Sequence, residues 1–290
     1  MRTNIHDRVS YHAVYDASIL DALHFARANG FAGIQIAVET PHLSFERLTT
    51  AEIGRIAGFM SSEGVYATLH APDEGASLFQ CSRHLSAGVS DYYQALFSFA
   101  REIDARLVTI HLGAMTVFST DDETGRRIPE DDLTLYGSCL KQNLEVVLRL
   151  AEGIIVCVEN HGLGEAEFEL LEPYLGHNGL FLCWDLVKGA SQPSVEARYL
   201  AHTEWIKQVH LHDRRKMASG SVKGHRTIGT GDIDFAKHLR ILMLEACVED
   251  YCIEVRPKEK AKESLSALLE IAERVEAEQP APGDANKPRA

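Results

Sequence analysis

The alternation of short apolar runs with longer amphipathic stretches constrains the fold more than any other feature of this chain. The apolar runs predict eight strands, at 8–12, 31–38, 65–71, 107–113, 154–160, 180–186, 206–213 and 251–256. Stretches with a helical period follow them, near 18–29, 50–63, 88–104, 130–152, 165–175, 194–202, 234–249 and 258–278. Because each strand precedes a helix, the sequence predicts the α/β class and a single (β/α)8 TIM barrel.

A doubly wound open sheet is the alternative fold. It is less favoured because no GxGxxG motif follows the first predicted strand and the chain has no P-loop. The 290 residues suffice for one large domain, and no linker divides them. We therefore expect one barrel domain over residues 1–278. The last residues, 279–290, are rich in proline, alanine and charge, which predicts a disordered tail.

The charge and composition of the chain disfavour nucleic acid and membranes as binding partners. With 42 acidic and 29 basic residues, the formal net charge of −13 disfavours binding to nucleic acid. We find neither an apolar run long enough to span a membrane nor a secretory signal, so we expect a cytoplasmic protein without membrane contact. The six cysteines form no CxxC pair, and we expect no disulfides.

Side chains that can bind metal close six successive predicted strands, the third to the eighth. In a barrel, the carboxyl ends of all strands meet at one mouth, so these side chains should converge. Two glutamates, an aspartate and at least one histidine suit a divalent ion such as Mn²⁺, Mg²⁺, Co²⁺ or Zn²⁺. A hydrogen-bonded network without metal is the alternative. The six residues are His70, His111, Glu159, Asp185, His210 and Glu254.

The residues two positions earlier share a strand face with these six and support this register. They are small or medium and weakly polar, which suits the filled interior of a barrel beneath a ligand layer. We interpret the cysteines among them as packing residues rather than ligands. The set is Thr68, Thr109, Cys157, Cys183, Gln208 and Cys252.

The stretch 206–235 has the highest concentration of histidine, acidic and basic residues that could form a functional site. His210 ends a predicted strand, and a basic loop is expected over 213–223, followed by a turn and a helix with Asp232 as its N-cap. The basic residues of this stretch suggest an anionic ligand, although a buried histidine before a solvated loop is an equally ordinary interpretation. They are Arg214, Arg215, Lys216 and Lys223.

Taken together, the segments TLHAP, TIHLG, VEN, the strand ending at Asp185, VHLHD with GHRTIGTGDIDF, and CIEVRP resemble the xylose isomerase-like TIM barrel superfamily. This superfamily includes sugar and sugar-phosphate isomerases and epimerases, and endonuclease IV-like barrels. The resemblance covers about residues 9–276. It implies a single-metal site held by Glu159, Asp185, His210 and Glu254, in which the two glutamates also act as the catalytic acid/base pair.

Two departures separate this chain from endonuclease IV-like enzymes, which bind a third zinc with two histidines and an aspartate. At the matching positions this chain has Lys188, Lys223 and His225, so lysine replaces one histidine and the aspartate, and one histidine is kept. A protonated lysine cannot ligate a metal, so a three-metal site is disfavoured. Positive charge at Lys188 and Lys223, with Lys216 or Arg215, instead suits a phosphate or carboxylate on a substrate.

The sequence therefore predicts a metal-dependent isomerase or epimerase of an anionic sugar or keto compound, using one divalent ion. Glu159 and Glu254 would transfer protons beside a carbonyl. The expected substrate-binding residues are His70, His111, Lys188, Lys216, Lys223 and His225.

Three other functions stay open. A phosphodiesterase acting on DNA would use His70 and His111 as ligands of a second metal bridged by Glu159. A dehydratase would begin with the same proton abstraction, and a non-catalytic binding module would need an incomplete ligand set. Dimers are common among barrels that resemble this one, and the sequence leaves open whether this chain forms a homodimer.

Overall fold

The computed structural model describes residues 4–73, 75–115, 130–176, 179–218 and 220–278. Eight parallel strands form a closed barrel in the order β1-β10-β7-β6-β5-β4-β3-β2, which confirms the predicted fold. β1 pairs with β10 on one side and with β2 on the other, and this pairing closes the ring. The barrel strands are β1 (Val9–Ala13), β2 (Gly33–Ala37), β3 (Tyr66–His70), β4 (Leu107–Ile110), β5 (Ile155–Glu159), β6 (Leu180–Asp185), β7 (Ile206–Leu211) and β10 (Asp250–Ile253).

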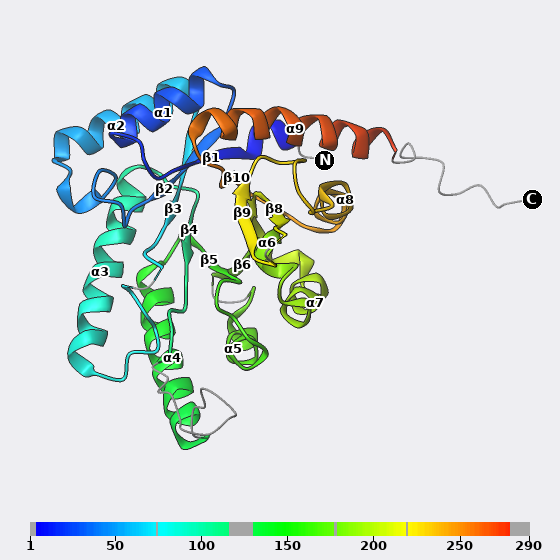
Figure 1. Cartoon of the computed structure of the whole chain (residues 1–290). Helices are drawn as coiled ribbons and strands as arrows, with labels where there is room; N and C mark the ends of the chain where they lie inside the picture. Colours follow the sequence, from blue (N-terminus) through cyan, green and yellow to red (C-terminus); the bar gives the residue numbers. More distant parts are fainter. Residues whose placement is uncertain (1–3, 74, 116–129, 177–178, 219, 279–290) are drawn as a thin grey trace, which may run out of the picture.

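Helices surround the barrel, and the long ones follow the predicted order (Figure 1). They are α1 (Ile19–Ala28), α2 (Thr50–Glu63), α3 (Arg83–Glu102), α4 (Glu130–Leu150), α5 (Glu165–Leu171), α6 (Leu186–Gly189), α7 (Pro193–Ala201), α8 (Phe235–Glu245) and α9 (Lys258–Ala277). Short 3-10 helices span Ile5–Arg8, Phe45–Arg47, Glu172–Tyr174 and Thr203–Trp205. The predicted tail, and most of the predicted loop 114–129, lie outside the described residues.

Local sequence signals explain where the helices begin and end. α2 starts at a capping box, in which Thr49 accepts a hydrogen bond from the Glu52 amide while the Glu52 carboxylate accepts one from the Thr49 amide. The same helix stops at Gly64, whose φ of 65° lies in the left-handed region that glycine adopts without strain.

The predicted loop 213–223 is wrong in part, because an antiparallel hairpin forms there from β8 (Asp213–Lys216) and β9 (Val222–Arg226). The buried Asp213 carboxylate anchors the hairpin by accepting hydrogen bonds from the amides of Gly231 (2.7 Å) and Ile233 (3.2 Å). Asp232 is not the N-cap of α8, because its carboxylate accepts from the Lys216 amide instead. Asp234 caps the helix.

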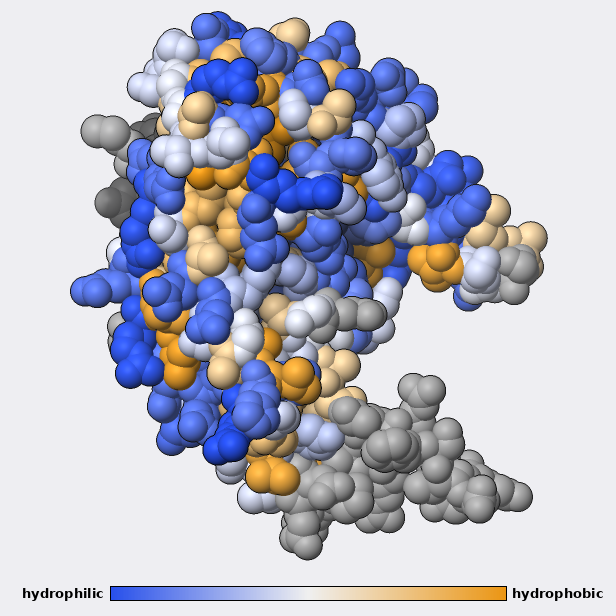
Figure 2. Space-filling model, turned by 90° about the vertical axis from the view of Figure 1, so that its left-hand side faces the viewer, coloured by the Kyte–Doolittle hydropathy of each residue, from blue (hydrophilic) through white to orange (hydrophobic). Residues whose placement is uncertain are grey.

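The large apolar core lies between the strands and the helices, where side chains of both are buried. A separate small cluster consists of Leu107, Cys157 and Cys183. Figure 2 shows one outer face, on which hydrophilic side chains predominate and hydrophobic ones are visible between them. Among the described helices, none is long and apolar enough to cross a membrane.

Two groups of buried polar residues lie inside the barrel at different heights. The upper layer is the set predicted from the strand ends, His70, His111, Glu159, Asp185, His210 and Glu254. The lower layer, nearer the amino ends of the strands, consists of Gln35, Thr68, Thr109, Gln208 and Asp250.

Asp250 is the centre of the lower layer. It accepts hydrogen bonds from Gln208 Nε2 (2.7 Å), the Tyr66 hydroxyl (2.7 Å) and Thr68 Oγ1 (3.4 Å). All three donors are neutral, and burial raises the pKa of this carboxyl in spite of them. The lower layer is thus a hydrogen-bonded support for the strands beneath the mouth.

Candidate active site

The upper layer borders a cavity of about 510 Å³ at the carboxyl ends of the strands. Glu159 and Glu254 line this cavity together with His70 and His111, and all four side chains are buried. His210 and Asp185 are fully buried just beneath it. The barrel therefore gathers the six predicted side chains at one end, as parallel strands with a common register should.

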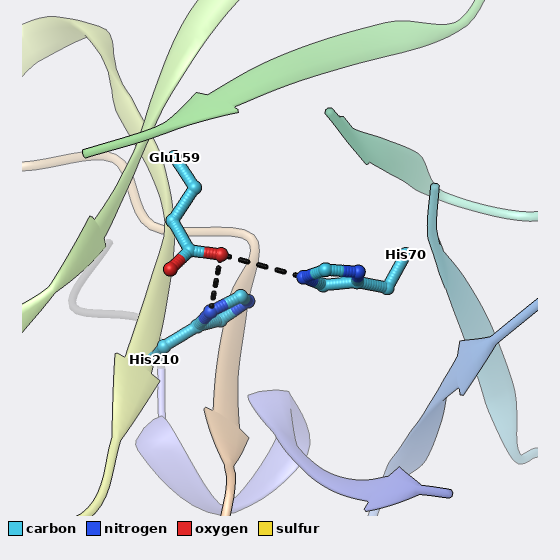
Figure 3. A group of neighbouring side chains, drawn as sticks. All are labelled: His70, Glu159 and His210. Carbon is cyan, nitrogen blue, oxygen red and sulfur yellow. Dashed lines mark hydrogen bonds and ion pairs between the residues drawn. The ribbon is translucent and has the colours of Figure 1, made fainter. Parts of the chain in front are cut away.

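Glu159, at the end of β5, is the hub of this cluster. Its Oε2 lies 2.8 Å from His111 Nε2, 3.2 Å from His210 Nδ1 and 3.3 Å from His70 Nε2. Figure 3 shows His70 and His210 pointing at this oxygen from β3 and β7. The other oxygen, Oε1, accepts a hydrogen bond from Lys188 Nζ at 2.7 Å. A single carboxylate thus connects three strand ends and a helix.

Glu254 follows β10 and also contacts His210, one of the three histidines that surround Glu159. Its Oε1 lies 3.3 Å from His210 Nδ1 and 3.3 Å from His12 Nδ1. His210 Nδ1 is therefore flanked by both glutamates, while its Nε2 lies 3.1 Å from Gln35 Nε2 in the lower layer. The two carboxylates face the cavity with one imidazole between them.

Asp185 has a different local role. One oxygen caps the short helix α6 by accepting from the amides of Val187 (2.8 Å) and Lys188 (3.0 Å). The other oxygen lies 3.3 Å from His212 Nε2 and 3.6 Å from Lys188 Nζ. Since Lys188 Nζ also contacts Glu159, its ammonium group sits between two of the predicted metal-binding carboxylates.

The electrostatic balance of the cluster keeps the carboxyl groups ionised. Burial alone would raise the pKa of Glu159, but the charges of His210, His111 and Lys188 outweigh burial and hold it well below its usual range. The pKa of Glu254 is likewise lowered, mainly by His210 and His12 against the effect of burial. Burial opposes protonation of His210, yet Glu254 and Glu159 raise its pKa to about 9.

Three sets of side chains among the described residues bring their ligand atoms within 4.8 Å of one another. They are His70 with Glu159 and His210, His70 with Asp73 and His111, and His212 with His225 and Glu254. Nitrogen and carboxylate donors of this kind fit a divalent ion. Asp185 belongs to none of these sets, so the four-ligand site expected from the sequence stays a prediction.

The structure separates the predicted substrate-binding residues into two groups. His70, His111, Lys188 and His225 line the cavity. Lys216 and Lys223 are exposed on the β8–β9 hairpin and are not among the cavity-lining residues, so their role stays a prediction.

The cavity is also lined by residues that were not identified from the sequence, among them His12, Asp73, His161 and Arg256. His12 lies near the end of β1, so it occupies the same kind of strand-end position as the six predicted residues. Arg256 lies two residues after Glu254, and the period of an extended chain places it on the same side. Asp73 and His161 lie on loops, where no periodic signal exists; Asp73 Oδ1 is 3.1 Å from His111 Nδ1.

Solved structures with the same fold are numerous, whereas a search of curated proteins finds no match. A D-tagatose 3-epimerase-like protein superposes with a TM-score of 0.74 at 17% identity, covering 93% of this chain and 98% of its own. An L-ribulose 3-epimerase gives 0.70 at 17% identity, covering 97% and 99%. The IolI protein with a bound zinc atom gives 0.63 at 13% identity, covering 93% and 96%.

At these identities the superpositions establish the fold alone. A sequence-family model, described as xylose isomerase-like TIM barrel, matches residues 23–274. This match spans most of the chain, including every upper-layer residue. The protein belongs to the xylose isomerase-like TIM barrel family.

Proposed function

We propose that this protein is a divalent-metal-dependent isomerase or epimerase of a sugar, sugar phosphate or related keto compound. The observation that carries the proposal is the pair of buried carboxylates, Glu159 and Glu254, which face one cavity from β5 and from the end of β10. Two structural neighbours named as 3-epimerases, with the family match, favour the same class of reaction.

The donor set supports a metal in this cavity. Glu159, His210 and Glu254 would hold the ion, with Asp185 as the fourth ligand predicted from the sequence. A bound divalent ion polarises a substrate carbonyl and makes the neighbouring C–H more acidic. Lys188 competes with such an ion, because its ammonium group already neutralises Glu159 and approaches Asp185.

The side chains themselves supply the proton transfers. Both glutamates are ionised, because their pKa values are lowered by neighbouring positive groups against the effect of burial. One ionised glutamate would therefore remove the proton beside the carbonyl. The other would first take up a proton from solvent in the cavity and would then return it to the opposite face. His70 and His111 line the same cavity and would hold substrate hydroxyls or the enediolate oxygen.

The experiment measures exchange of the substrate's α-proton in deuterated water. The purified protein is incubated with Mn²⁺ and a panel of ketoses, ketose phosphates and keto acids, and deuterium uptake is followed by NMR. We expect uptake with at least one compound, its loss after chelation, and its loss in Glu254→Gln. Full exchange in Glu254→Gln would refute the acid/base assignment, and hydrolysis of an abasic-site DNA without any sugar exchange would establish the phosphodiesterase instead.

An anionic substrate is part of the proposal, and Arg256 supports it better than the lysines do. Lys188 is already paired with Glu159, whereas Arg256 lines the cavity and its buried Nε has no hydrogen-bond partner among the described residues. A guanidinium group in this position suits a phosphate or carboxylate. Arg256→Met should raise KM for phosphorylated substrates about tenfold more than for unphosphorylated ones, and Lys223→Met should leave that ratio unchanged.

A further inference from the structure

Two cysteines face each other outside the active site. Cys81 lies between β3 and α3, Cys139 lies on α4, and their sulfur atoms are 2.7 Å apart across 58 positions of sequence. A disulfide bond is about 2.05 Å long, so the sulfurs are already close to bonding distance. Both residues line one surface pocket of about 340 Å³, and Cys81 is exposed. A small molecule in this pocket therefore reaches both thiols.

The backbone around Cys81 is already held against α4. Asn143 Nδ2 donates hydrogen bonds to the carbonyls of Leu78 (2.8 Å) and Gln80 (3.1 Å). Ser86 Oγ of α3 also donates to the Gln80 carbonyl, at 2.9 Å. Because these bonds fix the position of Cys81 relative to Cys139, linking the two sulfurs requires little backbone movement.

The other cysteines lack this combination of proximity and access. Cys157, Cys183 and Cys252 are buried inside the barrel, where burial raises the pKa of each thiol. Cys247 is exposed, but no contact to another cysteine is described for it. It therefore serves as an internal control for the reactivity of a lone surface thiol.

We propose that Cys81 and Cys139 form a redox site, at which a hydroperoxide converts the two thiols into a disulfide. The thiolate of Cys81 attacks the hydroperoxide, so an S–O bond forms, the O–O bond breaks, and the leaving oxygen takes a proton as water or an alcohol. The Cys139 sulfur then attacks the sulfenic acid, forming the S–S bond and releasing the hydroxyl group as water. The two thiols are oxidised and the peroxide is reduced.

The proposed disulfide would involve a segment that also contributes to the active-site cavity. The segment between β3 and α3 also carries Asp73, which contacts His111 in the active site. Gln80, next to Cys81, lines a second cavity of about 640 Å³ together with Asp73 and His111. Oxidation would therefore tie one wall of the site covalently to α4. Cys81 is exposed as a residue, but partial burial of its sulfur and the hydrogen bond with Cys139 raise its pKa to about 11. The thiolate fraction, and with it the reaction rate, should therefore increase as pH rises.

The test uses the full-length reduced protein and needs no substrate, so it is independent of the proposed function. The protein is treated with a small excess of hydrogen peroxide, the remaining thiols are alkylated, and tryptic peptides are analysed without reduction. We expect a linked pair of peptides, 56–83 and 128–141, with a loss of two hydrogen atoms. A reducing dithiol should restore both thiols.

Control variants separate the pair from general thiol oxidation. Cys81→Ser and Cys139→Ser should each abolish the linked peptides, and Cys247→Ser should leave their yield unchanged. The proposal is overturned if wild-type Cys81 accumulates as sulfinic acid without linking to Cys139, or if peroxide produces only dimers joined through Cys247. The wild-type protein alone shows whether the linked peptides form or one of these two products accumulates instead. A variant that fails to fold therefore does not affect the conclusion.

Discussion

The two layers inside the barrel show how carboxyl groups at similar burial acquire pKa values shifted in opposite directions. In the lower layer, Asp250 is surrounded by neutral donors, and burial raises the pKa of its carboxyl. In the upper layer, Glu159 is equally enclosed, but His210, His111 and Lys188 overcome burial and lower the pKa of its carboxyl. The charge of the neighbours, and not burial, therefore decides whether the pKa of a buried carboxyl is lowered or raised in this molecule.

The largest expected effect on α-proton exchange comes from a comparison of two variants, each of which replaces one buried carboxylate by an amide, one in each layer. Glu159→Gln should reduce α-proton exchange by about a thousandfold or more, because it removes a proton-transfer group. Asp250→Asn should leave exchange within about threefold but lower the free energy of unfolding by about 2 kcal/mol, because an amide cannot accept all three hydrogen bonds. Exchange assays and urea unfolding measure the two effects. Loss of exchange in Asp250→Asn would show that the lower layer takes part in catalysis.

The second prediction concerns pH and the metal-free protein. The pKa of His210 is raised to about 9 in the folded state, so its stabilising effect is complete below about pH 6.5 and is lost as pH rises through about 9. The upper limit of this loss is about 3 kcal/mol. Urea unfolding between these pH values should show the decline, and His210→Asn should flatten it. Asp250→Asn is the matched control and should retain the wild-type slope.

The third prediction is that Mn²⁺ raises Tm only when the carboxylate of the upper layer is intact. A ligand at a hundred times its dissociation constant stabilises by about 2.7 kcal/mol, which for a chain of this size raises Tm by about 5 °C. We expect Mn²⁺ to produce such a rise in the wild type and in Asp250→Asn, and none in Glu159→Gln. Differential scanning fluorimetry with and without chelator measures it. An equal rise in Glu159→Gln would place the ion elsewhere.

The smallest effect is expected at Lys188. Its ammonium group lies 2.7 Å from Glu159 Oε1 and 3.6 Å from Asp185 Oδ2, so it repels a cation held by these carboxylates. Lys188→Met should tighten Mn²⁺ binding by about tenfold, equivalent to about 1.4 kcal/mol. Isothermal titration calorimetry provides the measurement, with Lys223→Met as the exposed control. Weaker binding in Lys188→Met would mean that the lysine supports the ion.

The fold was predictable from sequence because strand and helix periods are local signals that repeat eight times. The hairpin β8–β9 was not, since it depends on Asp213 binding the distant amides of Gly231 and Ile233. Hydrogen bonds of this kind leave no periodic trace, and a basic stretch is equally compatible with a loop.

The candidate site was predictable where residues close a strand, and less so elsewhere. Glu159, His210 and Glu254 meet at one end of the barrel because parallel strands end at a common rim. Asp185 illustrates the limit, because a carboxylate after a strand serves equally well as a ligand or as a helix cap. The interaction of Lys188 with Glu159 depends on side-chain direction, which the sequence does not encode locally.

The pairing of β1 with β10 has a consequence for biosynthesis. Val9 of β1 registers with Tyr251 of β10, so the ring stays incomplete until Tyr251 has left the ribosome. During that interval the nascent sheet exposes two unpaired edges, which are prone to bind other chains. Pairing between strands so far apart in the sequence predicts that these edges stay exposed until β10 has been made.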